Sequence, residues 1–183
     1  MLASIWLQVV GEQRAALQSL IASLAAEHGT VPFDPHLTVC GGPDLDRARW
    51  DAVADYVRRS AVLPLTVRRT RISYSTTVWS RAVIIGIEDD PAITAFREEL
   101  SRIAGAAILA PPHISLLYTR DESGQRLSWA ASETRLRAIA EECPARVERT
   151  EFVLGNPVVV APDGDWANIR SWKVMRSLEG RKR

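Results

Sequence analysis

The 183-residue sequence is poor in cysteine, in net charge and in long apolar runs. Its two cysteines, Cys40 and Cys143, form no CxxC pair and no zinc framework; a disulfide stays open, but a reduced intracellular pair is the simpler interpretation. A net charge of +1 argues against a protein that grips a long nucleic-acid backbone. No apolar stretch is long enough to span a bilayer, and the N-terminus lacks a basic n-region, so we expect a cytoplasmic protein without a signal peptide.

What the sequence does contain is ordinary for a globular protein, with 46% hydrophobic and 25% charged residues. This length allows one domain, or one compact body of two lobes, with a sizeable core. No low-complexity linker divides it. We therefore expect a single bilobal domain over residues 1–183, with 179–183 as a frayed tail.

Hydrophobic periodicity predicts alternating helices and strands. The order helix, histidine-containing strand, helix, strand occurs twice, which suggests a structural duplication. Asp44 is a candidate N-cap for the second helix, and Pro91 suits the first turn of the third. We predict an α+β fold of two antiparallel sheets with helices packed outside. The expected helices cover about 12–28, 45–59, 91–103 and 132–143, and the expected strands about 2–10, 36–40, 63–73, 78–88, 113–118, 146–154, 157–161 and 166–176.

Two short motifs stand out in the predicted strands. His36 is followed two residues later by Thr38, and His113 by Ser115, and a proline precedes each histidine. Strand side chains alternate between faces, so each histidine shares a face with its hydroxyl residue. If the two strands lie side by side, two imidazoles and two hydroxyls converge. The third histidine, His28, ends a predicted helix, where a surface or capping role is expected.

This set of groups suits acid–base chemistry on a phosphate ester. Histidine titrates near neutral pH, so one imidazole can accept a proton while the other donates one. The hydroxyls of Thr38 and Ser115 can bind non-bridging phosphate oxygens. Acidic residues do not cluster near either motif, so we expect no metal and no other cofactor.

The motifs resemble those of the 2H phosphoesterase superfamily, and most closely the cyclic phosphodiesterases of plants and yeast. The likeness includes residues 4–6, the following helix, the segment 33–39 and the segment 112–118, and it is weak over 121–183. It implies a bilobal, pseudo-twofold fold with a cleft between the sheets. It also implies hydrolysis of 2',3'-cyclic nucleotides and of ADP-ribose 1'',2''-cyclic phosphate, with His36 as general acid and His113 as base; the near-symmetry of the motifs leaves the reverse assignment open.

The resemblance further points to aromatic residues beside the substrate's base. Trp6 and Tyr118 match such positions, and aromatic faces stack on nucleobases. Trp6 is equally suited to a core position. Tyr118 falls on the opposite face from His113, so it must sit at the strand end to reach the cleft. Trp79 and Thr77, in a turn before a central strand, are further candidates.

Three other functions remain open. One is RNA 2',3'-cyclic phosphodiesterase or 2'-5' ligase-like processing of short RNA ends, which arginines at the cleft, such as Arg68, Arg69 and Arg71, would favour. Another is a non-catalytic nucleotide binder, against which the intact motifs argue. The last is a metal-dependent hydrolase, for which ligands at the right spacing are missing. We expect a small cyclic nucleotide as ligand, no membrane and no obligate protein partner. Cys40 shares the His36 face, where a packing role is expected.

Overall fold

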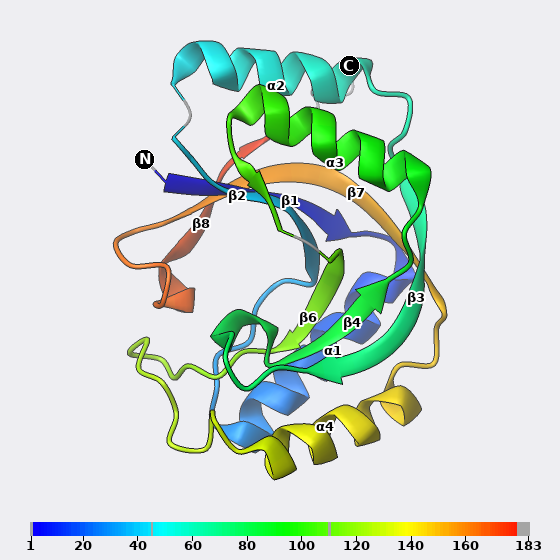
Figure 1. The fold of residues 1–183 in the computed structure, drawn as a ribbon. Coiled ribbons are helices and arrows are strands. Elements are labelled where there is room, and N and C mark those ends of the chain that lie inside the picture. Colours follow the sequence, from blue (N-terminus) through cyan, green and yellow to red (C-terminus); the bar gives the residue numbers. More distant parts are fainter. Residues whose placement is uncertain (1, 45, 110, 179–183) are drawn as a thin grey trace.

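The computed structural model describes residues 2–44, 46–109 and 111–178, and the expected tail 179–183 lies outside them. Figure 1 shows strands surrounded by helices on two opposite sides. The helices are α1 (Glu12–His28), α2 (Arg47–Arg59), α3 (Pro91–Ala104) and α4 (Glu133–Arg146), with short 3-10 turns η1 (Trp79–Arg81) and η2 (Ile169–Ser171). The strands are β1 (Leu2–Val9), β2 (His36–Asp44), β3 (Leu65–Tyr74), β4 (Val83–Ile87), β5 (Ala107–Ile108), β6 (His113–Leu117), β7 (Glu151–Pro162) and β8 (Trp172–Ser177).

The strands form one antiparallel sheet in the order β1-β2-β6-β4-β3-β7-β8, and β1 also pairs with β7. These pairings close a circuit, because β2–β1–β7 and β6–β4–β3 are joined both at β3–β7 and at β2–β6. The α+β class with helices outside is confirmed. The two expected sheets are halves of a single sheet, since the long strand β7 pairs with β3 through its first residues and with β1 and β8 through its last.

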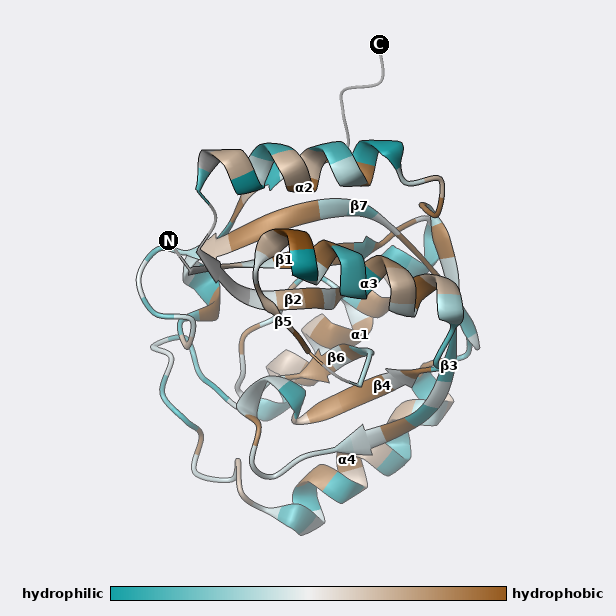
Figure 2. Ribbon diagram, turned by 45° about the horizontal axis from the view of Figure 1, so that its top comes forward, coloured by the Kyte–Doolittle hydropathy of each residue, from teal (hydrophilic) through white to brown (hydrophobic). Residues whose placement is uncertain are grey.

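The helices cover the two halves crosswise. Helix α1 follows β1 but packs against β6 of the other half, and α3 follows β4 but packs against β2. Helix α4 packs on β3 and β4, and α2 packs on α3. Figures 1 and 2 show the resulting pairs, α2 with α3 and α1 with α4, on opposite sides of the strands. The order helix, histidine strand, helix, strand is present twice, as predicted.

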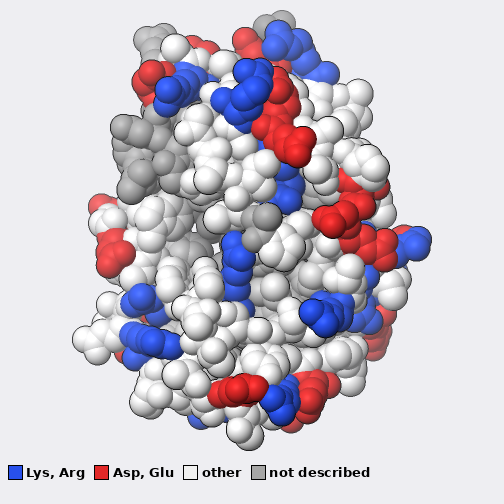
Figure 3. Space-filling view, viewed as in Figure 1, with Lys and Arg blue, Asp and Glu red and all other residues white. Residues whose placement is uncertain are grey.

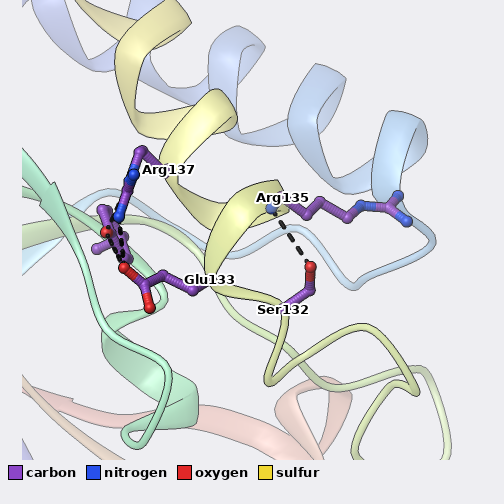
Figure 4. Close-up of polar contacts among 5 residues, drawn as sticks. Ser132, Glu133, Arg135 and Arg137 are labelled. Atoms are coloured by element: carbon purple, nitrogen blue, oxygen red, sulfur yellow. Dashed lines mark hydrogen bonds and ion pairs between the residues drawn. The ribbon is translucent and has the colours of Figure 1, made fainter.

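Local capping chemistry explains most helix ends. Gly29 ends α1 in the left-handed conformation, and the Asp90 carboxylate accepts hydrogen bonds from the first backbone N–H groups of α3. The N-cap of α2 is Asp46, not Asp44, because β2 continues to residue 44 and the helix starts later. Ser132 caps α4 by accepting from the Arg135 N–H (Figure 4).

Figure 4 also shows the first turn of α4 tied to β3. Glu133 and Arg137, one helical turn apart, form an ion pair, and the Tyr74 hydroxyl donates to Glu133 over 3.2 Å. Glu133 and Arg137 are largely exposed and Tyr74 is partly buried, so the ion pair itself adds little to the free energy of unfolding.

The remaining boundaries differ where long-range pairing overrides local pattern. The two strands expected at 146–154 and 157–161 are one strand, because β7 keeps pairing with β1 across Pro157, with a register shift nearby. The last strand begins at Trp172 instead of 166, since 163–171 turns back through a bond from the Asp163 N–H to the Ser171 carbonyl. The short β5 was not predicted.

The core lies between the helices and the sheet and inside the sheet's curvature. Its buried aliphatic and aromatic side chains come from both halves of the sheet and from the four helices. Figure 2 shows that several strands carry hydrophobic residues, coloured brown. No described helix is long and apolar enough to cross a membrane.

Candidate active site

The two motif strands are neighbours, joined at one residue pair. Leu37 of β2 pairs with Ile114 of β6 in antiparallel register, and both side chains are fully buried. Alternation turns the flanking residues to the opposite face, so His36 comes beside Ser115 and His113 beside Thr38. The structure thus brings together the four motif residues that the sequence singled out.

Each imidazole is held by a backbone carbonyl two residues earlier. Nδ1 of His36 lies 2.6 Å from the Asp34 carbonyl oxygen, and Nδ1 of His113 lies 2.8 Å from that of Pro111. A carbonyl only accepts, so both Nδ1 atoms carry the proton and donate it. In the neutral form each Nε2 then keeps its lone pair, free to accept a proton. The same local arrangement therefore prepares both histidines for proton transfer.

Burial keeps both imidazoles uncharged in the free protein. It lowers the pKa of His36 to about 4 and that of His113 to about 4, against an ordinary 6.5, despite the carbonyl bonds, which favour the charged form. The nearby imidazole lowers the pKa of His36 further, and Arg81 and Arg97 lower that of His113. The charged groups that act on the pair are therefore cationic, and an anion that enters will favour protonation.

The two hydroxyls have different partners. Ser115 Oγ donates its proton to the Ser80 carbonyl oxygen at 2.8 Å, so this hydroxyl can only accept further hydrogen bonds. Thr38 is partly exposed, and its hydroxyl has no hydrogen-bond partner among the described residues. Thr38 therefore has a hydroxyl proton to offer a phosphate oxygen, whereas Ser115 secures the turn η1.

A cavity of about 290 Å³ opens on the His36 side of this group. Half of the residues that line it are aromatic, His36 included, and among the described residues no other acidic or basic side chain lines it. His113 and Ser115 do not line it, although the Ser80 that Ser115 holds does. The lining residues are Ala3, Ser4, Trp6, His36, Thr38, Gly41, Trp79, Ser80, Leu109, Tyr118, Trp166 and Trp172.

Trp6 and Tyr118 both reach the cavity but are largely engaged by the protein. The Trp6 ring stacks on His36, and its indole N–H donates to Ser4 Oγ at 2.9 Å. Tyr118 directly follows the last residue of β6, so it lies at the strand end, where we expected it if it was to reach the cavity. Its ring stacks on that of Phe33 with centroids 3.7 Å apart. Burial raises the pKa of Tyr118, so its phenol stays protonated.

Other predicted residues lie elsewhere. Trp79 lines the cavity, but Thr77 does not, because it sits exposed in the preceding turn within hydrogen-bond distance of Ser75. The arginine cluster of β3 does not line the cavity either: Arg68 pairs with Glu151, and Arg71 faces α4. Cys40 is fully buried, and burial raises the pKa of its thiol to about 11, which suits a packing role.

Sequence reasoning missed two cavity walls, Trp166 and Trp172. Trp166 comes from the β7–β8 connection and Trp172 is the first residue of β8, in the part of the chain where the family likeness is weak. They contact each other at 5.5 Å between centroids, and the Trp172 indole N–H donates to the Trp166 carbonyl. Four of the six tryptophans line one cavity, a concentration that only the fold reveals.

Comparison with solved structures shows the fold. A structure described as a phosphoesterase aligns over 87% of this chain and 87% of its own, with a TM-score of 0.51 and 14% identity. Usb1 of Kluyveromyces marxianus aligns over 86% of this chain and 92% of its own, with a TM-score of 0.47 and 9% identity. No protein-family model and no curated protein matches the sequence. The chain therefore has the α+β fold of that phosphoesterase, as the resemblance implied.

Proposed function

We propose that this protein hydrolyses cyclic phosphate diesters on ribose, with 2',3'-cyclic nucleotides as substrates and ADP-ribose 1'',2''-cyclic phosphate as a related one, without a metal. The observation that carries this is the matched pair of Nδ1–carbonyl bonds. These bonds orient two equivalent imidazoles on the strand face that also carries Thr38 and Ser115. The aromatic cavity beside this face would hold the nucleobase.

The proton transfers balance with two histidines alone. Water attacks phosphorus and loses a proton to Nε2 of His113, while the P–O bond to ribose breaks and the leaving oxygen takes a proton from Nε2 of His36. Thr38 donates to a non-bridging oxygen. A proton exchange with solvent afterwards restores both histidines, so no oxidant, metal or covalent intermediate is needed.

His36 must be protonated before the reaction, and the substrate helps to protonate it. Its pKa of about 4 belongs to the free protein, where no negative charge balances an imidazolium. A bound cyclic phosphate brings one negative charge into the same space and raises that pKa. The stacked indole of Trp6 favours the cation as well.

The cavity favours a small substrate with little selection among bases. The indole N–H groups of Trp6 and Trp172 already bond within the protein, so the walls offer mainly stacking surface. On the face in Figure 3, acidic and basic side chains are interspersed, without the broad basic stripe that long RNA requires. We place the enzyme in the cytoplasm, in keeping with two buried free cysteines, as a single domain without an obligate protein partner.

One observation favours the alternative, processing of short RNA ends that carry a 2',3'-cyclic phosphate. The Arg120 guanidinium lies 5.0 Å from the ring centroid of Trp79, at the wall of the cavity. A cation there suits the phosphate of a preceding nucleotide. A dinucleotide ending in a 2',3'-cyclic phosphate tests this, because preference for it over the mononucleotide would support the RNA-end activity.

The test is hydrolysis of 2',3'-cyclic AMP in EDTA, with the 2'- and 3'-phosphate products separated. We expect turnover by the wild type and a loss of about 10²-fold or more in His36→Ala and in His113→Ala. His28→Ala is the matched control, because its imidazole lies near Trp129, away from the cavity, and we expect full activity. Activity that survives in both motif variants, or that EDTA abolishes, would refute the two-histidine mechanism. Binding without turnover would make the protein a nucleotide binder.

A further inference from the structure

Helix α3 buries a cation that contacts the segment before the second histidine motif. The Arg97 side chain is only 4% exposed, and one Nη atom donates to the Leu109 carbonyl oxygen. Its Nε has no hydrogen-bond partner, and no ion pair is formed by Arg97 within the described part of the chain. A buried guanidinium without a carboxylate costs stability, so its presence calls for a role other than holding the fold together.

The carbonyl that Arg97 holds belongs to the segment that shapes the site. Leu109 lines the aromatic cavity and packs near Gly41 of β2. Two residues later, the Pro111 carbonyl accepts the Nδ1 proton of His113, and the Pro112 carbonyl accepts the backbone N–H of Ile87. Arg97 and both prolines line the same hollow between α3 and this segment. The guanidinium thus holds the start of the segment whose end orients His113.

We propose that Arg97 is a positioning residue for His113: by holding the Leu109 carbonyl it places Pro111, whose carbonyl keeps the imidazole in one tautomer. The catalytic consequence rests on the proposed function, whereas the effect on the imidazole does not. Nothing in the two histidine motifs themselves points to this residue, which comes from a separate helix.

The charged groups that act on His113 differ from those around His36, which supports a separate role for Arg97 at His113. Arg81 of η1 and Arg97 of α3 both disfavour its imidazolium, and the neighbouring titratable group on β2 is His36. On β4, the residue that faces it is Gly86, which carries no charge. Asp89 and Cys40 act on Arg97 itself, and both favour its charge. The charges of two arginines therefore act on His113, while His36 is stacked on an indole.

Nuclear magnetic resonance of the three histidines tests the proposal without any substrate. In the wild type, we expect the ring nitrogens of His113 to show the Nδ1–H tautomer and to titrate far below the ordinary range. In Arg97→Met, which keeps the length but removes the charge and the donor, we expect mixed tautomers and a midpoint higher by on the order of one pH unit. Arg97→Lys retains the charge and should stay closer to the wild type in midpoint.

Arg102→Met is the matched control, since this exposed arginine of the same helix pairs only with Glu99. It should leave both readouts of His113 unchanged. Folded Arg97→Met with the wild-type tautomer and midpoint would overturn the proposal. If that variant does not fold, Arg97→Gln, which keeps an amide donor for Leu109 but not the charge, should raise the midpoint while it retains the tautomer, and an unchanged midpoint in it would overturn the proposal. If the wild type hydrolyses the substrate, kcat should fall by about tenfold in Arg97→Met. An active wild type whose His113 spectrum does not change in Arg97→Met would refute only the role of Arg97. A His113 spectrum that changes as expected in a protein without activity would refute only the enzyme assignment.

Discussion

The indole of Trp6 lies flat on the imidazole of His36, with ring centroids 3.6 Å apart and planes 8° from parallel. His113 makes no such ring contact within the described residues; instead, the charges of Arg81 and Arg97 lower the pKa of its imidazole. Two histidines with the same Nδ1 bond thus differ in what surrounds the rest of the ring. The stack favours a cation at His36 and the arginines disfavour one at His113, which agrees with the acid and base roles that the family resemblance implies.

Loss of the stack should weaken the acid. In Trp6→Leu, imidazolium at His36 loses a cation–π contact of about 1 kcal/mol, so kcat should fall about fivefold, and the alkaline limb of its pH profile, which reports the general acid, should move to lower pH. The pH profile of 2',3'-cyclic AMP hydrolysis measures this. Trp6→Phe retains a ring and serves as the control, because both variants shrink the same buried side chain. An equal effect in the two would mean that packing, not the stack, is responsible.

Stability should fall as the solution is acidified through the range between the two pKa values. The folded pKa of each motif histidine is about 4 and the unfolded value is about 6.5, so the unfolded chain binds more protons in between. The free energy of unfolding has its full value above pH 6.5 and decreases toward pH 4. The total loss is about 3 kcal/mol per histidine once the pH is below both pKa values. Urea unfolding at several pH values measures this. His113→Asn keeps an N–H for Pro111 and should show a shallower slope; an unchanged slope would contradict the buried neutral state.

The two hydroxyl residues should respond differently to removal of their oxygen. Thr38→Val removes a hydroxyl that has no hydrogen-bond partner in the described part of the chain, so KM should rise and kcat fall, by about tenfold or more in kcat/KM, with little loss of stability. Ser115→Ala leaves the Ser80 carbonyl without its donor and should cost about 1–3 kcal/mol of stability. Steady-state kinetics and urea unfolding of both variants separate the roles. A larger stability loss in Thr38→Val than in Ser115→Ala would reverse the assignment.

Gly124 should be indispensable for the wall of the cavity. Its φ is +79°, and a Cβ there would come within 3.1 Å of the Ala167 backbone, beside Trp166. Gly124→Ala should therefore cost the left-handed strain of about 1–2 kcal/mol plus displacement of the 163–168 loop. Gly11, with φ +73° and nothing within 4 Å of a Cβ, is the control for strain alone. Equal unfolding midpoints for the two alanine variants would show that the loops do not press on each other.

Short-range chemistry in the sequence was enough to predict the motif geometry. Period-two alternation placed His36 with Thr38 and His113 with Ser115, and proline at the first turn of α3 was correct. Long-range pairing was out of reach: nothing local indicates that β7 joins both halves or that Trp166 and Trp172 return to the His36 side. The burial of Arg97 had a signal, since it lies one turn after Ile93 on the face that α3 buries, but an arginine there reads as polar surface.

The crosswise helices mean that the chain cannot be divided at its own repeat. A fragment ending after β4 would carry α1 without the strand β6 that it covers, and would expose β2 where α3 belongs. The complementary fragment would lack the partners of β6 and α3 in the same way, and each fragment would hold only one of the two motif histidines. Neither piece has a finished interior, so the repeat is a unit of sequence but not of folding, and the first place where both histidines can meet is the completed molecule.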